Sequence, residues 1–140
     1  MGYRSDVAIG IGFTSREALV AFLATYRLAS DPSTMDQLAE DFRITELGKT
    51  IILHCNYNGI KWYDSYDDVK RVHNLMSEAN EAGASTIFIR IGEEDNDIET
   101  EYNENDEHTQ LWEFFGVKRE LICLDYESAQ NITDYINTQE

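Results

Sequence analysis

The residues best able to do chemistry in this sequence are the carboxylates of one acidic segment, residues 93–107. Counting from Asp95, they occupy positions 1, 3, 5, 7 and 12 of a 12-residue loop, and carboxylate oxygens are the ligands that Ca²⁺ prefers. Position 6 is Thr100, where the turn of an EF-hand requires glycine, and no convincing helix precedes the segment. The pattern therefore predicts no dedicated calcium site, and it leaves weak divalent binding open. Nine of the 15 residues are acidic and none is basic; the nine are Glu93, Glu94, Asp95, Asp97, Glu99, Glu101, Glu104, Asp106 and Glu107.

Histidine and cysteine provide no clear second centre. His54 and Cys55 are neighbours in a β run, so their side chains face opposite ways and cannot share one metal. Cys123 lies far from Cys55 and neither belongs to a CxxC pair, a pattern typical of two reduced core thiols. His73 is expected on a helix as a residue of its surface or of the boundary between surface and core, and His108 is expected in a solvated loop. No metal site and no catalytic arrangement can be predicted, so we expect a protein that is not an enzyme.

Two glycines near the start could belong to a motif that binds a dinucleotide cofactor. Gly10-Ile11-Gly12 follows a predicted strand and precedes a helix, as in a dinucleotide fingerprint. The third glycine would fall on Ser15, and the sequence has no GxxxxGK[ST] phosphate loop. We therefore predict no cofactor, and we expect the two glycines to permit close packing within a strand.

Two aromatic clusters are candidates for contact with a partner protein, because Trp and Tyr dominate binding hot spots. The first contains Trp62, Tyr63 and Tyr66, at a junction between a strand and a helix. One of Trp62 and Tyr63 must point into the core, and the other is a contact candidate together with Tyr66. The second cluster surrounds Trp112, just after the acidic segment.

The hydrophobic periodicity predicts the elements that position these residues. Helices are predicted from the capping-box pattern at residues 14–17, from Pro32, from the cap at residues 65–68 to Gly83, and over residues 128–137. Gly48-Lys49 is a plausible two-residue turn, and Asn58-Gly59 is the strongest hairpin signal. Strands are predicted over residues 5–13, 43–47, 50–57, 60–63, 85–91 and 117–125.

This order of elements predicts a single α+β domain over residues 1–140. We expect an antiparallel or mixed sheet of about five or six strands with helices mainly on one face, and a ferredoxin-like topology fits the order. The acidic segment 93–107 is expected as an excursion from this domain, with a short strand around residues 98–102.

Charge limits the partners. Eleven Lys and Arg face 27 Asp and Glu, a net charge of −16, so the chain repels nucleic acid and anionic membranes and is attracted to basic surfaces or cations. Solubility alone could also explain the charge. No apolar run approaches the ~18 residues of a membrane span, and the first residues lack the features of a signal peptide. We therefore expect a cytoplasmic protein without a direct nucleic-acid or membrane partner.

Three segments resemble small proteins encoded by tailed bacteriophages and prophages. They are residues 1–7 (MGYRSDV), 59–66 (GIKWYDSY) and 88–93 (FIRIGE), and together they cover about a sixth of the chain. The function of that family is not established. The resemblance implies a viral gene expressed in the cytoplasm of a bacterial host, and it implies no particular chemistry. Residues from Ser128 onward depart from the family pattern as an extension.

These observations support several functions. The first is a phage protein that binds and inhibits or modulates a host protein, including an anti-defence factor whose carboxylates imitate nucleic acid and occupy a basic groove in a nucleic-acid-handling enzyme. Its contact residues would be the nine acidic residues above with Trp62, Tyr66 and Trp112. The alternatives are a small-molecule or metal-binding protein, which would need converging basic groups such as Arg4, Lys61 and Arg90, and a virion accessory protein. An enzyme is a weaker alternative.

Overall fold

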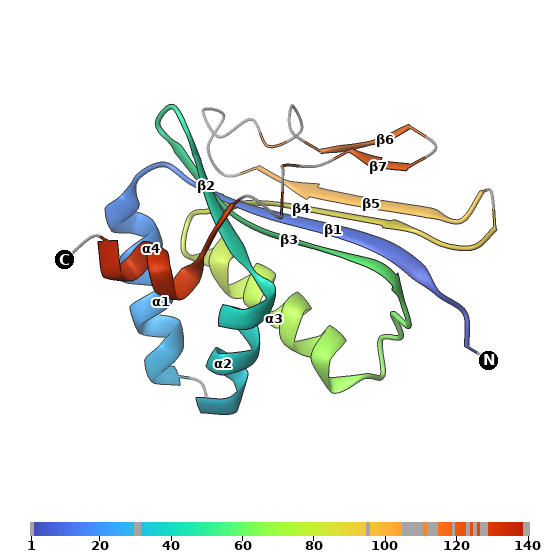
Figure 1. Cartoon of the computed structure of the whole chain (residues 1–140), viewed down its shortest axis with the longest axis horizontal. Helices are drawn as coiled ribbons and strands as arrows, with labels where there is room; N and C mark the ends of the chain where they lie inside the picture. Colours follow the sequence, from blue (N-terminus) through green and yellow to red (C-terminus); the bar gives the residue numbers. More distant parts are fainter. Residues whose placement is uncertain are drawn as a thin grey trace.

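The computed structural model describes residues 2–29, 32–94, 96–104, 111, 115–118, 120–122, 124, 126 and 129–138. Figure 1 shows one sheet with the helices on one side of it and a short hairpin on the other. The elements are, in chain order, β1 (Ser5–Phe13), α1 (Arg16–Ala29), α2 (Pro32–Asp41), β2 (Arg43–Leu47), β3 (Thr50–Ile60), α3 (Asp67–Glu81), β4 (Ser85–Ile91), β5 (Ile98–Asn103), β6 (Gly116–Lys118), β7 (Glu120–Ile122), β8 (Gln130–Asn131) and α4 (Ile132–Thr138).

The main sheet contains six strands in the order β5-β4-β1-β3-β2-β8, and every neighbouring pair is antiparallel. Its inner strands, β4-β1-β3-β2, are connected as β-α-β-β-α-β, with α1 and α2 in the first crossover and α3 in the second. This is the split βαβ arrangement of ferredoxin-like folds. The predicted single α+β domain is confirmed, and the sheet is antiparallel, not mixed.

The helix layer buries the apolar faces that the periodicity predicted. These faces pack against the side chains that β1 sends to the same side, including Val7, Ile9 and Ile11. Full burial of such a side chain contributes roughly 1.5–3 kcal/mol, so this layer is the main source of stability. The buried residues are Leu19, Phe22, Leu23 and Tyr26 on α1 and Val69, Val72, Leu75, Met76 and Ala79 on α3.

Helix ends follow the predictions in part. Ser15 Oγ accepts a hydrogen bond from the Ala18 N–H at 3.1 Å, which fixes the start of α1. Gly83 (φ 103) follows the end of α3 as predicted. The predicted side-chain cap of α3 is absent, because the N-cap residue is Tyr66 and no side chain there bonds to the helix amides. Two aspartates in the first turn favour the helix start instead, through the helix dipole.

The Asn58-Gly59 pair does not form a hairpin turn, and this prediction was wrong. Strand β3 continues through it to Ile60, so no separate strand covers residues 60–63. Gly59 (φ 65) lies where the register of β1 and β3 shifts, and its N–H donates to Asp6 Oδ1 at 2.8 Å. The positive φ that this pair favours is used in a β-bulge. The Gly48-Lys49 turn between β2 and β3 forms as predicted, with Gly48 at φ 63.

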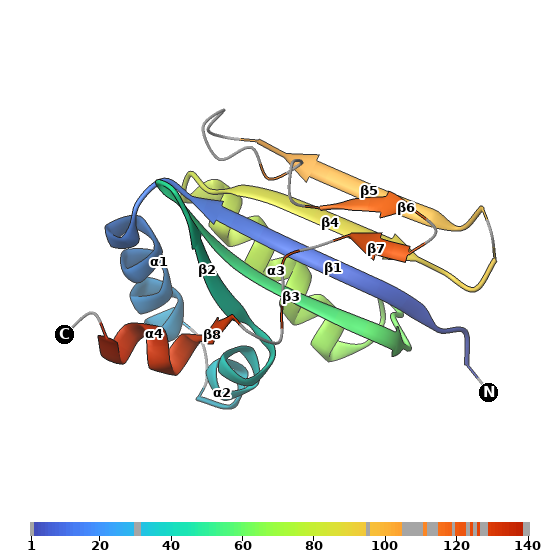
Figure 2. The ribbon, with the colours of Figure 1, turned by 45° about the horizontal axis from the view of Figure 1, so that its top comes forward.

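The face of the sheet opposite the helices carries a second apolar cluster. Leu111 and Phe115 pack there on Ala8, Ile52, Ile87 and Ile89. The Phe115 ring lies over Gly10, where a Cβ atom would come within 2.6 Å of it. The glycine in the middle of β1 therefore serves close packing, as the sequence predicted. Figure 2 shows the β6–β7 hairpin lying over the same face, across β4 and β1.

Two C-terminal predictions need correction. The single strand expected over residues 117–125 is instead the small β6–β7 hairpin, which forms its own two-stranded sheet. The terminal helix begins at Ile132, later than predicted, because β8 first pairs with β2. Asn131 Oδ1 then accepts from the Asp134 N–H at 2.8 Å and caps α4.

Two expectations from composition concern single features of the described residues. Cys55 is a buried cysteine of the core on β3, as predicted, whereas Cys123 lies outside the described residues. Within the part of the chain that the structure describes, no helix is long and apolar enough to cross a membrane.

Candidate functional site

Residues 1–7, 59–66 and 88–93 meet at one end of the sheet, where β1 begins and β3 and β4 end. The Tyr3 N–H donates to Tyr63 Oη at 2.6 Å. Arg4 Nη1 donates to the Gly59 carbonyl at 2.7 Å, and the Arg4 N–H donates to Glu93 Oε1 at 3.2 Å. These segments, far apart in the chain, thus form one cluster of contacts.

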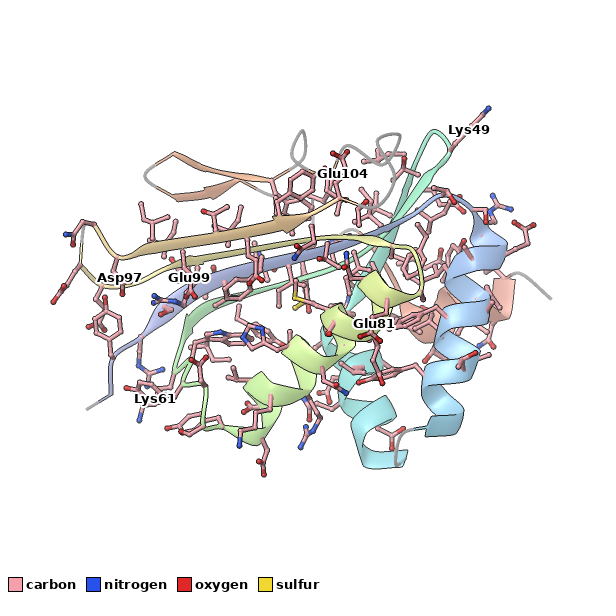
Figure 3. All side chains as sticks on the ribbon, turned by 180° about the vertical axis from the view of Figure 1, so that it is seen from behind. Lys49, Lys61, Glu81, Asp97, Glu99 and Glu104 are labelled. Atoms are coloured by element: carbon pink, nitrogen blue, oxygen red, sulfur yellow. The ribbon has the colours of Figure 1, made fainter. Side chains whose placement is uncertain are left out.

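At this end, three residues form what we call the hairpin clamp: Tyr3, Arg90 and Asp97. Arg90 donates to both carboxylate oxygens of Asp97, at 2.7 and 3.1 Å, and Tyr3 Oη donates to Asp97 Oδ2 at 2.6 Å. The same guanidinium also donates to Glu99 Oε1 at 2.8 Å and to Ser5 Oγ at 3.1 Å. Figure 3 shows Asp97 and Glu99 side by side at this end. The clamp therefore ties the β4–β5 hairpin to the start of β1.

The electrostatics of the clamp are self-consistent. The Arg90 guanidinium, followed by the Tyr3 hydroxyl, lowers the pKa of Asp97. The hydrogen bond to Asp97 raises the pKa of Tyr3, and Asp97 and Glu99 raise that of Arg90 despite its partial burial. Gly92 has no room for a side chain, because a Cβ atom there would meet the Asp97 carboxylate and the Tyr3 hydroxyl. The clamp is thus closely packed as well as charged.

The clamp supports a row of exposed carboxylates that we call the acidic edge: Glu93, Glu94, Glu99, Glu101 and Glu104. Glu93 and Glu94 lie at the tip of the hairpin, and Glu99 and Glu101 lie on β5, which is an outermost strand of the sheet. The short strand predicted around residues 98–102 therefore forms as the edge strand β5 (Ile98–Asn103), which covers six of the 15 residues of the acidic segment. The alternate residue Tyr102 packs against the second apolar cluster.

Four of the predicted contact residues cannot be placed. Asp95, Asp106, Glu107 and Trp112 lie outside the described residues. Asp97 is placed, but its carboxylate is occupied by the clamp, so it has a positioning role within the hairpin.

The first aromatic cluster divides between core and surface. Trp62 is buried, with its ring centroid 5.9 Å from those of Tyr57, His73 and Phe88. Tyr66 is 40% exposed. Of the two, only Tyr66 therefore presents a surface to a partner, with Tyr63 packed edge-on against it at 5.1 Å.

The basic residues at this end are largely committed to internal contacts. Arg90 bonds to the clamp and Arg4 to a backbone carbonyl, while the Lys61 side chain lies against Gly2, whose Cβ would come within 2.9 Å of Lys61 Cε. Lys61 and Asp97 lie at the same end of the molecule in Figure 3. Arg4 and Arg90 therefore do not form a pair of converging donors that could bind an anionic ligand.

Metal binding by the acidic segment is limited by its conformation. Strand β5 carries two carboxylates, Glu99 and Glu101, which lie on one face of an extended strand about 6.8 Å apart, so they cannot surround one ion as the ligands of an EF-hand loop do. Among the described residues, no group of three or more His, Cys, Asp or Glu side chains is placed to hold a metal.

Comparison of the chain with protein-family models, with curated proteins and with solved structures found no significant match. Any assignment of function therefore depends on the geometry above.

Proposed function

We propose that this protein is a non-enzymatic, phage-encoded protein that binds and inhibits or modulates a host protein with a basic surface, and that the acidic edge is its contact surface. The observation that carries the proposal is the pairing of exposed carboxylates with a rigid support. Glu93, Glu94, Glu99 and Glu101 lie on a hairpin that the clamp fixes through Asp97, and Glu104 follows the end of that hairpin. Charged groups held in place before binding lose less entropy on association than charges on a loose tail.

The spacing of the charges favours one version of this proposal. Alternate residues on a strand are about 6.8 Å apart, whereas duplex DNA carries one charge per ~1.7 Å of axis. A single strand edge with Glu99 and Glu101 is therefore several times sparser than a duplex. This favours attraction to a basic protein groove over close imitation of double-stranded nucleic acid. The excess of carboxylates over the whole chain adds long-range attraction to either target.

Affinity capture from bacterial lysate tests the proposal. The wild-type protein is immobilised, loaded at ~0.1 M salt and eluted by a step to ~1 M, where exposed charge pairs are screened. We expect a host protein with a basic surface to elute in the step. If nothing specific is retained, or if retention is unchanged in ~1 M salt, the proposal is wrong.

Two matched variants locate the contact. The first carries Glu93→Gln, Glu94→Gln, Glu101→Gln and Glu104→Gln, all on the acidic edge. The second removes the same charge from exposed positions on the helix side, by Glu17→Gln, Asp36→Asn, Glu40→Gln and Asp64→Asn. Capture should be lost in the first variant and kept in the second. Equal loss in both would mean that net charge, and not the acidic edge, attracts the partner.

A further inference from the structure

A groove of about 570 Å³ opens between α1 and the carboxyl end of α3, in the helix layer and not on the acidic edge. Its floor is aromatic: the Phe13 and Phe22 rings lie 5.7 Å apart, and Phe22 and Tyr26 are also 5.7 Å apart and stacked. In Figure 3, Glu81 lies at the end of α3 that faces α1. The volume is within the range of about 300–1,000 Å³ that is common for binding pockets.

The walls of the groove are built from small side chains. Ala21 and Thr25 are exposed residues of α1 that line the groove, and Ala82 and Gly83 line the opposite side after α3. Small residues allow the backbone of a partner to approach closely, and the aromatic floor receives apolar side chains. These are the requirements of recognition by a helix in a groove, in which one apolar face of an amphipathic helix is buried.

The charge at the rim is unusual for a helix end. Glu78 and Glu81 both line the groove and both lie in the last turn of α3, which contains no basic residue. The carboxyl end of a helix carries partial negative charge and favours Lys or Arg, so two glutamates there are unfavourable. Among the side chains that the structure describes, the ion pairs are formed by Arg16 and Arg90, and none of these pairs involves Glu78 or Glu81. A cation supplied from outside would relieve this repulsion.

We propose that this groove binds one amphipathic helix of a partner protein, with apolar anchor residues flanked by Lys or Arg. The aromatic floor takes the anchors, and Glu78, Glu81 and the carboxyl end of α3 attract the cations. This inference is independent of the acidic edge, and it gives the protein a second contact surface with a different kind of partner segment.

A model peptide tests the inference on the full chain. The probe is a peptide of about 15 leucine and lysine residues with its leucines on one helical face, since shorter helices are marginal in water. We expect it to shift the backbone amide signals of Ala21, Thr25 and Gly83 in a ¹⁵N-labelled sample. The variant E78K/E81K should weaken binding about tenfold, because two attractive charge pairs become repulsive. Ala21→Trp should weaken binding by filling the groove at an exposed position.

The control variant E101K/E104K makes the same change of charge on the acidic edge and should leave binding within about twofold. Circular dichroism and the unfolding temperature of each variant show that the fold is kept. Equal loss in both charge variants would overturn the inference, because attraction would then be nonspecific. The inference is also overturned if the peptide does not shift the amide signals of the groove, or if a peptide with glutamine in place of every lysine binds with the same affinity. A third contrary result would be that a small apolar dye shifts these amide signals and the peptide does not. Retention of groove binding by the acidic-edge variant separates this result from the fate of the proposed function.

Discussion

The β4–β5 hairpin and the carboxyl end of α3 are both acidic, but their carboxylates lie in opposite electrostatic environments. On the hairpin, Arg90 neutralises Asp97 and also contacts Glu99, and a packed tyrosine completes the arrangement. At the end of α3, Glu78 and Glu81 face a helix terminus that already carries negative partial charge. On the hairpin, part of the negative charge is used in hydrogen bonds and ion pairs within the protein. At the end of α3, the two negative charges lie where the helix dipole disfavours them.

The difference shows that formal charge is a poor guide to the charge available for binding. The net charge of −16 counts Asp97 and Glu81 equally. Asp97 is stabilised where it is, so a partner would have to compete with Arg90 for it. A cation close to Glu81 would lower the unfavourable electrostatic energy at the end of α3. The four predictions that follow test this contrast, from the largest expected effect to the smallest.

Arg90→Ala should destabilise the protein by about 2 kcal/mol, because it leaves a partly buried Asp97 without its cation. The effect is smaller than for a fully buried pair, since 31% of the Asp97 side chain and 57% of the Glu99 side chain are exposed. Urea unfolding followed by circular dichroism measures it. The control is Arg16→Ala, which breaks the more exposed Arg16–Glu46 pair and should cost below about 1 kcal/mol. Equal losses would contradict the special role of the clamp.

Gly92→Ala should destabilise the protein by about 1–2 kcal/mol, because the new methyl group meets the Asp97 carboxylate and the Tyr3 hydroxyl. The same unfolding measurement applies. The double variant Gly92→Ala/Asp97→Ala provides the test of cause, since removal of the carboxylate makes space for the methyl group. Its loss should be clearly smaller than the sum of the two single losses. Additive losses would place the strain elsewhere.

The pH dependence of stability should report the clamp directly. The pKa of Asp97 is lowered in the folded state, so its contribution is present above the ordinary value of about 4 and is lost as pH falls through the lower folded value. The stability difference between wild type and Asp97→Asn should therefore shrink in acid. Tyr3 behaves oppositely: its raised pKa gives a contribution that is present below about 10 and lost at higher pH. Unfolding midpoints across pH measure both, and a difference that does not change with pH would contradict them.

Glu81→Lys should stabilise the protein by about 0.5 kcal/mol, the opposite sign to Arg90→Ala, because a cation then occupies the end of α3 beside Glu78. The thermal unfolding midpoint measures this change. The control Glu101→Lys alters charge equally on a strand that has no helix end, and it should change stability by less than about 0.3 kcal/mol. A destabilised Glu81→Lys protein would show that Glu81 has an intramolecular role.

The helices were predictable because they depend on local periodicity. The sheet order was not, because it depends on pairing between distant strands, and the order of elements only suggested a ferredoxin-like topology. The apolar positions predicted for the inner faces of α1 and α3 repeat at helical spacing, and those named above are buried. The Asn58-Gly59 prediction was wrong because positive φ is required by a bulge as well as by a hairpin turn, and nearby residues do not distinguish the two. The strand expected over residues 117–125 was wrong in extent, since an apolar run does not show where a short hairpin turns.

The candidate sites were harder to predict, because their parts lie far apart in sequence. Tyr3 and Asp97 are separated by 94 positions, and only the pairing of β1, β4 and β5 brings them together. One signal was present: Arg90 is the only charged residue of β4, and an acidic strand follows it. A similar signal marked the groove, where Glu78 and Glu81 precede Gly83 against the usual preference for basic residues at helix ends.

The central place of β1 has a consequence for how the chain is made. This strand is synthesised before its second partner, β4, which ends about 80 residues later, roughly 4–16 s at about 5–20 residues per second. The apolar strip of Ala8, Ile52, Ile87 and Ile89 stays uncovered until Leu111 and Phe115 have been synthesised, because these two residues cover it in the folded protein. Until residues 111–115 have been synthesised, this face of the sheet exposes an apolar surface. We therefore expect the nascent chain to need protection by chaperones during that time.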